Sequence, residues 1–273
     1  MVNKKNEVAV AESRELAGPL GVDLSAYAGM GMEEVDQSSL AIPFLALLQG
    51  LSPQVESVDG AKPGLYIDTI TSELMKEVRV IPCAFQRRFI RWAPRSRGGG
   101  YKGDYNPTDV TLKRIPGMSE HDGVILMDVP PGQPAFDEKG APNYDKLSDT
   151  RNHYVLYESA EGTWRPALVS LASTQIKKSK RWMSLIGGIE LRAPDGRIYT
   201  PPSFAYIYRL KALKEKNAKG EWWGVEVSMD GPVEEQEVFA KAAAFHKSVA
   251  AGEVQVQEPI DADYEEASEP SGF

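Results

Sequence analysis

Two stretches of this 273-residue chain interleave Lys or Arg with aromatic residues. Proteins that bind single-stranded nucleic acid use cations to follow the phosphates and aromatic faces on which the bases stack. The first stretch runs from Arg79 to Arg114 and holds nine bases against two acids. Its residues that we expect to contact DNA are Arg87, Arg88, Arg91, Trp92, Arg95, Arg97, Tyr101 and Lys102.

The second stretch, Ser170 to Gly188, predicts a short amphipathic helix. Ser173 or Thr174 can serve as its N-cap, and Gly187-Gly188 ends it. Apolar residues recur at helical spacing, so one face should pack on the core while the other stays basic. Trp182 suits either base stacking or a core anchor, and the sequence leaves both readings open. The expected DNA-binding residues are Lys177, Lys178, Lys180, Arg181 and Trp182, with Arg209 and Lys211 on the hairpin that follows.

The C-terminal segment from Glu253 to Phe273 contains seven acids and no base. It accounts for most of the net charge of −8, whereas residues 41–252 are mildly basic. Such a segment can compete with phosphate for a cationic groove, and a terminal Phe can enter a partner's apolar pocket. The expected partner-binding residues are Asp261, Asp263, Glu265, Glu266 and Phe273.

Features that indicate catalysis or a cofactor are weak. A single cysteine, Cys83, and three scattered histidines argue against a metal site. The glycine-rich stretch 97–103 departs from a nucleotide phosphate loop, because Lys102 precedes a glycine where the loop needs Lys before Ser or Thr. We therefore expect no enzyme, no catalytic residues, no metal and no cofactor.

The same composition bears on location. The chain contains no run of about 18 apolar residues, so we expect no membrane-spanning helix. Its first residues lack the apolar core of a signal peptide. With one cysteine the chain forms no internal disulfide, and a reducing cytoplasm is the expected setting.

Hydrophobic periodicity predicts a mainly β fold with a few helices, of the α+β class. We expect an OB-like antiparallel barrel with a bridging helix, a C-terminal helix and a disordered acidic tail; a mixed α+β sandwich is the competing architecture. Pro82 should mark a bulge or an edge. The expected strands are 64–70, 77–92, 123–129, 152–158, 164–171, 203–214 and 221–228, and the expected helices are 43–49, 170–188 and 233–250.

Three segments follow from these patterns. Residues 1–37 read as a flexible N-terminal segment, and residues 251–273 as the disordered acidic tail. Residues 38–250 form the expected OB-like nucleic-acid-binding domain, which carries an insertion at about 104–150.

A basic, aromatic body with an acidic tail ending in Phe resembles the single-stranded DNA-binding proteins of bacteria and bacteriophages. The segments IPFLALLQGLSPQV and STQIKKSKRW are similar to bacteriophage replication and recombination proteins. The resemblance implies an OB-type barrel that binds and protects single-stranded DNA, and a tail that recruits replication or recombination proteins. Assembly as a homo-oligomer would suit such a protein. The chain is longer than the simplest members, and the 104–150 insertion has no counterpart among them.

Two other classes of function compete with this hypothesis. A virion structural or assembly protein could use the acidic tail as a scaffold contact. A strand-annealing recombination protein or a nuclease would also need a cationic surface. Copurification with particles, strand annealing and metal-dependent cleavage distinguish these classes.

Overall fold

The computed structural model describes residues 27, 29–32, 41–93, 101–108, 124–127, 138, 145–218 and 220–256. The chain divides into two units, residues 1–40 and 41–273, and the account below concerns the second. Several predicted site residues lie outside the described residues: Arg95, Arg97, Asp261, Asp263, Glu265, Glu266 and Phe273.

The fold is mainly β with a few helices, as the sequence predicts. The described helices are α2 (Gln54–Ser57), α3 (Ile176–Gly187) and α4 (Gln236–Ala251), with short 3-10 turns at Ser173–Gln175 and Ser203–Ala205. The strands are β1 (Ala41–Ile42), β2 (Leu45–Leu47), β3 (Tyr66–Asp68), β4 (Leu74–Met75), β5 (Glu77–Trp92), β6 (Tyr101–Tyr105), β7 (Val124–Met127), β8 (Asp145–Glu158), β9 (Trp164–Ala172), β10 (Leu191–Arg192), β11 (Ile198–Tyr199), β12 (Tyr206–Asn217), β13 (Gly220–Pro232) and β14 (Gln255–Val256).

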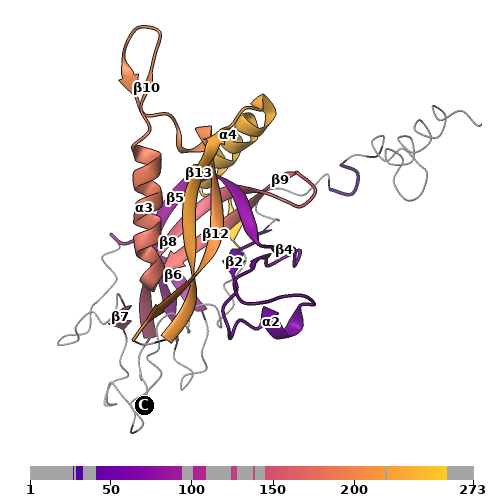
Figure 1. Cartoon of the computed structure of the whole chain (residues 1–273), viewed down its shortest axis with the longest axis vertical. Coiled ribbons are helices and arrows are strands. Elements are labelled where there is room, and N and C mark those ends of the chain that lie inside the picture. Colours follow the sequence, from indigo (N-terminus) through magenta and orange to yellow (C-terminus); the bar gives the residue numbers. More distant parts are fainter. Residues whose placement is uncertain are drawn as a thin grey trace, which may run out of the picture. The chain divides into compact units, whose positions relative to one another are not determined.

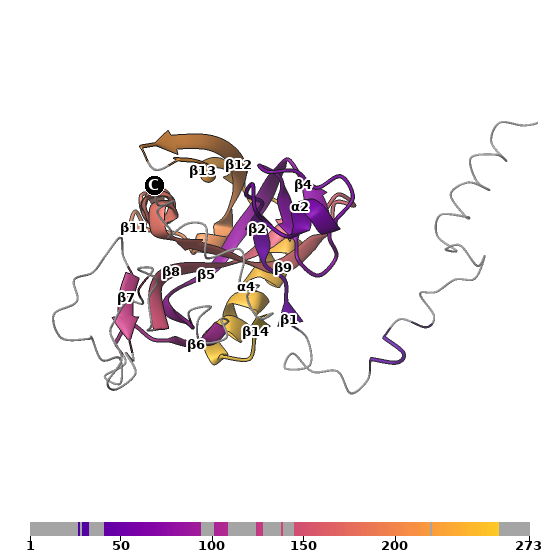
Figure 2. The same cartoon turned by 90° about the horizontal axis from the view of Figure 1, so that it is seen from below.

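A seven-stranded antiparallel sheet dominates the second unit. Its strand order is β13-β12-β5-β8-β7, with β6 also paired to β5 and β9 to β8. The register of β5 against β8 shifts between Pro82 and Ala84, which confirms the bulge expected where proline cannot donate to the ladder. The long strands curl, as Figures 1 and 2 show. Within the described residues no backbone ladder joins β13 to β9, so the sheet does not close into the predicted barrel.

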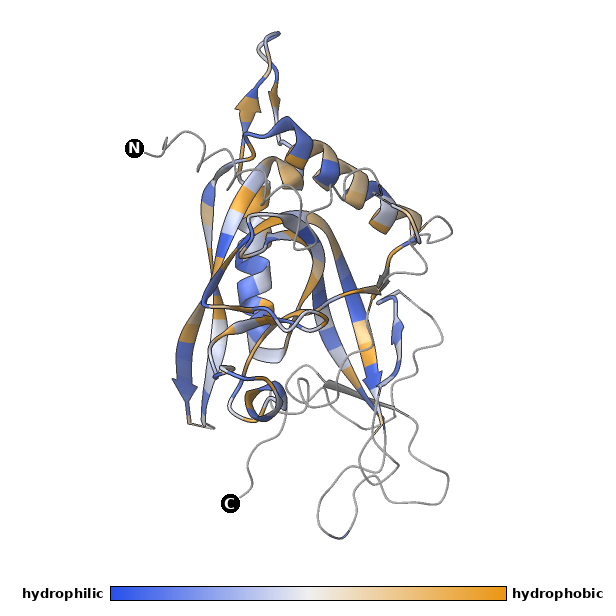
Figure 3. Ribbon diagram, turned by 90° about the vertical axis from the view of Figure 1, so that its right-hand side faces the viewer, coloured by the Kyte–Doolittle hydropathy of each residue, from blue (hydrophilic) through white to orange (hydrophobic). Residues whose placement is uncertain are grey.

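Helix α4 covers the outer side of the curled sheet and lies across the top in Figure 3. Val238 and Ala242 pack on Ile81, Cys83 and Leu156 of strands β5 and β8. The helix ends at Gly252, whose φ of 74° is the left-handed conformation that glycine adopts at helix ends. Residues 251–256, which the sequence assigned to the tail, belong to the fold, because β14 pairs in parallel with β1.

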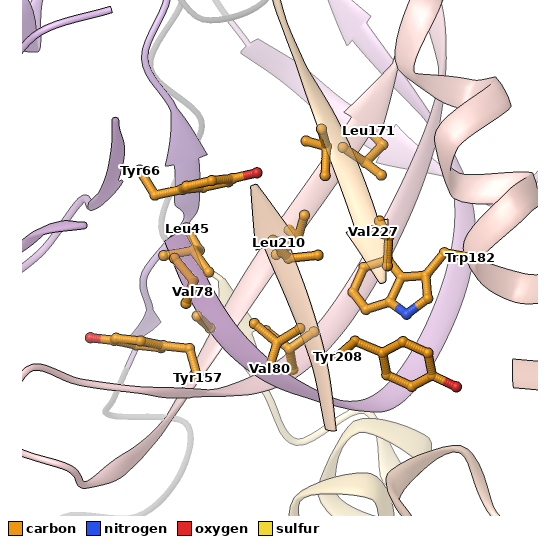
Figure 4. Packing of buried hydrophobic residues seen from close by; sticks show 14 of the residues in the cluster. Leu45, Tyr66, Val78, Val80, Tyr157, Leu171, Trp182, Tyr208, Leu210 and Val227 are labelled. Atoms are coloured by element: carbon orange, nitrogen blue, oxygen red, sulfur yellow. The ribbon is translucent and has the colours of Figure 1, made fainter. Parts of the chain in front are cut away.

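The main core fills the inner side of the curl (Figure 4). It gathers residues from five strands of the large sheet, together with Leu45 of β2, Tyr66 of β3, and Trp182 and Ile186 of α3. Helix α3 and the small β2-β3-β4 sheet therefore fill the opening that the large sheet leaves. Burying one such side chain stabilises the fold by roughly 1.5–3 kcal/mol.

Two glutamine side chains occupy the free edge of β13. The Trp223 N–H donates to Oε1 of Gln49 at 2.9 Å, and Nε2 of Gln49 donates to the Trp223 carbonyl at 2.9 Å. Two residues further along, the Val225 N–H donates to Oε1 of Gln175 at 2.9 Å. Side-chain amides thus take the place of a neighbouring strand, which removes the liability of an unpaired edge.

Two predicted elements differ from the structure. The apolar run 43–49 was expected to be helical, but Leu45–Leu47 forms strand β2 and Phe44 bridges to Leu168 of β9. Short apolar runs fit a buried strand as well as a helix, and here pairing with other strands decides. The 104–150 region was expected to be an insertion, but β7 and the first residues of β8 within it belong to the large sheet.

Replacing Gln49 with Leu should destabilise the protein by about 1–3 kcal/mol, because the Trp223 backbone groups lose their partners in a part-buried site. Urea unfolding followed by circular dichroism measures the change. Gln54→Leu is the matched control, since the buried Oε1 of Gln54 has no hydrogen-bond partner in the described part of the chain. Equal stability of the two variants would contradict the role of Gln49.

Candidate nucleic-acid interface

Helix α3 presents a row of cations to solvent. Ser179, Trp182 and Ile186 are its buried residues, and Lys177, Lys180 and Arg181 are exposed on the opposite face. Residues three and four apart are neighbours on a helix surface, so these three cations are adjacent. We call Lys177, Lys180 and Arg181 the cationic stripe.

The electrostatics of α3 are locally unfavourable. The segment Ile176–Gly187 contains no acid, and its four cations lie in the first two turns, close to the positive end of the helix dipole. Like charges at these spacings repel, at roughly 0.2–0.5 kcal/mol per pair. Lys178 forms an ion pair with Glu215 of β12. Within the described residues, no ion pair involves the cationic stripe.

Trp182 anchors the helix in the core. Its side chain is 0% exposed and stacks on the His153 ring, with the ring centroids 4.4 Å apart and the planes 15° from parallel. The Tyr208 ring also packs against Trp182, with 6.0 Å between the ring centroids (Figure 4). The ring is therefore not accessible for base stacking, and the core-anchor reading of Trp182 is the correct one.

Polar groups also lie where α3 packs against the large sheet. His153 is 1% exposed, and its Nε2 lies 2.8 Å from Oγ of Ser179 on the helix. Burial, and secondarily the charge of Arg151, lower the pKa of His153 from 6.5 to about 3, so the ring is neutral. In the described structure, Nδ1 of His153, Nε1 of Trp182 and the Tyr208 hydroxyl have no hydrogen-bond partner.

The arginines of the first stretch that the structure describes form ion pairs with acids. Arg87 makes a bidentate pair with Asp149 at 2.9 and 2.8 Å. Arg88 pairs with Asp104 at 2.8 Å, and Arg91 with Asp145 at 2.6 Å. Asp145 and Asp149 come from the neighbouring strand β8, more than fifty residues away in sequence. These ion pairs therefore neutralise the positive charge of Arg87, Arg88 and Arg91 on β5.

The pleat of β5 divides this stretch between two faces. Phe85 contacts His153, with 5.1 Å between ring centroids, so its side of the strand is the side on which α3 lies. Arg87 and Arg91 share that side by alternation, and Arg88 and Trp92 take the other. Trp92 is 8% exposed and packs edge-on against Tyr101, which is half-buried.

The remaining predicted residues do not join α3. Tyr208 and Leu210 point into the core, so Arg209 between them and Lys211 after them face outward. Arg209 bonds to both carboxylate oxygens of Asp230, and both cations pair with Glu77. Lys102 of β6 is exposed. The predicted site thus separates into the cationic stripe, two faces of β5 and the outer face of β12.

Sequence reasoning missed Phe85, which is 36% exposed on the side of β5 that α3 shares. Because Phe85 and Arg87 are two residues apart in a predicted strand, their spacing could have indicated a common face. Asp145 and Asp149 carried no comparable signal, because the β5–β8 register decides which arginine each one meets.

Other kinds of site find no support in the described residues. No group of three or more His, Cys, Asp or Glu is arranged to hold a metal ion there. Among the helices of that part of the chain, none has the length and hydropathy to cross a bilayer.

Fold and site together define a mainly β protein in which a cationic helix fills the opening of a curled antiparallel sheet. The chain belongs to the Pam3 phage gp34-like protein family, whose model matches residues 11–255. Searches among curated proteins and among solved structures gave no significant match. The name of the family links the chain to bacteriophages.

The buried His153 should make stability depend on pH. Between pH 6.5 and about 3 the unfolded chain binds a proton that the folded chain excludes, so stability falls as the pH drops through this window. The slope from this residue reaches at most about 1.4 kcal/mol per pH unit. Denaturant unfolding at pH 7 and at pH 4.5 should show a smaller loss for His153→Gln than for the original chain. His246→Gln, a histidine of α4, is the control, and identical losses in all three proteins would contradict the assignment.

Proposed function

We propose that this protein binds and protects single-stranded DNA, without enzymatic activity, in phage replication or recombination in the host cytoplasm. The observation that carries the proposal is the cationic stripe of α3. Three exposed cations lie side by side on a helix with no acid, and none forms an ion pair with a described residue.

A bound phosphate backbone would relieve the strain that the stripe creates. Repulsion between the cations and their position near the positive end of the helix both oppose this arrangement in the free protein. Phosphates at the stripe reverse both effects, and counterion release from the nucleic acid adds to the affinity. Lys and Arg contacts to phosphate carry no base information, so we expect little sequence preference.

The neighbouring face of β5 can extend this surface. The Arg87 side chain is 43% exposed and lies on the side that α3 shares, where it can exchange Asp149 for a phosphate. Phe85 offers a partly exposed ring on the same side, which supports base stacking in place of the buried Trp182. Arg88, Arg209 and Lys211 face away and are left out of the proposed interface.

The acidic tail has two proposed roles. Its carboxylates, among them Asp261, Asp263, Glu265 and Glu266, compete with phosphate for the cationic stripe at low salt. Phe273 with its terminal carboxylate recruits a replication or recombination protein.

Reversing the stripe with Lys177→Glu, Lys180→Glu and Arg181→Glu should weaken binding to an oligo-dT strand by at least about tenfold, because the phosphate contacts are lost and the new charges repel phosphate. Each lost contact should also lower the salt slope by about 0.7. Fluorescence anisotropy at two salt concentrations measures both quantities. The control variant Lys62→Glu, Lys76→Glu and Lys247→Glu changes the net charge equally at exposed lysines elsewhere.

Three results would count against this proposal. The original chain would fail to bind at low salt, its binding would be indifferent to salt, or the control variant would lose as much affinity as the stripe variant. Strand-annealing and metal-dependent cleavage assays on the same samples test the annealing and nuclease alternatives.

Removing residues 257–273 should tighten DNA binding at low salt and abolish partner recruitment, while leaving β14 intact. The tightening should disappear at high salt, because screening weakens the competition between tail and phosphate. Phe273→Ala is the matched control: it keeps the tail's acids, so it should lose recruitment without a change in DNA affinity. An unchanged or weaker affinity after truncation contradicts the competing role of the tail.

A further inference from the structure

Two adjacent tryptophans, Trp222 and Trp223, lie on β13 and face opposite sides of the β12–β13 hairpin. The Trp223 ring serves packing, because it lies against Gly64, where a Cβ would come within 2.9 Å of the ring. Trp222 is partly exposed, whereas Trp182, the anchor of α3, is fully buried. Trp222 therefore keeps ring surface that the described part of the fold leaves uncovered.

A hydrogen bond and an ion pair connect Trp222 to helix α3. The Trp222 Nε1 donates at 2.9 Å to Oε2 of Glu215, its partner across the β12–β13 ladder. The other carboxylate oxygen of Glu215 forms the ion pair with Lys178 of α3. Gly224 leaves room for this carboxylate, since a Cβ there would lie 2.7 Å from Oε2 of Glu215. One carboxylate thus holds the indole and the helix together.

These contacts place Trp222 beside the cationic stripe. Gln175, three residues before Lys178, accepts a hydrogen bond from the Val225 N–H of the same hairpin. Residues three apart are neighbours on a helix surface, so the side of α3 that contains Gln175 and Lys178 faces the hairpin. Arg181 is three residues beyond Lys178 and lies where this side meets the stripe. Figure 1 shows α3 alongside the hairpin.

The Glu215 carboxylate does not cancel the charge of the stripe. One of its oxygens meets Lys178, which is not a member of the stripe, and the other accepts the Trp222 N–H. The Lys178 and Glu215 side chains are only 26% and 20% exposed, so solvent and salt screen their mutual attraction weakly. An anion that approaches Arg181 therefore meets cations without an ion pair among the described residues and, next to them, an aromatic ring.

We propose that Trp222 stacks on a base of the bound strand and gives the cationic stripe a preference for single strands over duplexes. This inference rests on the function proposed above. Phosphate contacts alone do not supply the preference, because a duplex has the higher density of phosphate charge. The bases of a single strand are free to lie on an aromatic face, whereas those of a duplex are already stacked on one another. A ring held beside the stripe by Glu215 meets this requirement.

Trp222→Ala should weaken binding to oligo-dT by about tenfold or more, because stacking on one base contributes roughly that factor. Its affinity for a duplex of equal length should not change, and fluorescence anisotropy at low salt measures both affinities. Trp222→Phe keeps a ring, so it should retain most of the oligo-dT affinity while losing the quenching of tryptophan fluorescence that oligo-dT causes in the original chain. Phe239→Ala is the matched control, since it removes a ring that is 38% exposed on α4, on the other side of the sheet.

The outcomes separate this inference from the function on which it rests. A Trp222→Ala variant that binds oligo-dT as tightly as the original chain overturns the stacking role and leaves the role of the stripe intact. An equal loss of oligo-dT and duplex affinity, or an equal loss in Phe239→Ala, also overturns it, because neither is specific to stacking on Trp222. Failure of the original chain to bind oligo-dT at low salt refutes the proposed function and this inference together.

Discussion

The free edge of β13 is the constraint on which the rest of the second unit depends. A sheet that curls without closing leaves one row of backbone groups unpaired and one side of its core open. Gln49 and Gln175 satisfy the edge at Trp223 and Val225. The same two glutamines sit beside β2 and at the start of α3, so the elements that satisfy the edge also cover the core. Together with the burial of Trp182, this requirement fixes the position of α3 and the direction of its cations.

Burial and electrostatics act against each other in α3, and burial prevails. Repulsion among its cations and their unfavourable position on the dipole each cost a few tenths of a kcal/mol to about 1 kcal/mol. A fully buried side chain such as Trp182 contributes roughly 1.5–3 kcal/mol, and Ile186 adds to it. The unpaired polar atoms of His153 and Tyr208 reduce this surplus. The helix therefore stays packed on the core although its exposed cations do not stabilise it.

The sequence predicted those features that depend on local pattern. Alternation located β5, proline marked its bulge, and helical spacing identified the buried face of α3. Features that depend on pairing between distant strands could not be predicted. Asp145 and Asp149 neutralise Arg91 and Arg87 only because of the β5–β8 register. The apolar run at Leu45 carried no periodicity that separates strand from helix, and only its pairing with β3 settles it as β2.

These ion pairs change what the net charge of the chain implies for DNA binding. A net charge of −8 would be expected to repel DNA, yet screening limits each exposed charge to a range of about 8–10 Å at ordinary ionic strength. Within that range the ion-paired arginines of β5 and β12 present little charge, because each lies beside a carboxylate. The cationic stripe keeps its charge, since α3 brings no acid of its own. Local arrangement thus separates two kinds of cation among the described residues: those whose ion pairs tie strands together, and the cationic stripe, which forms no ion pair with a described residue.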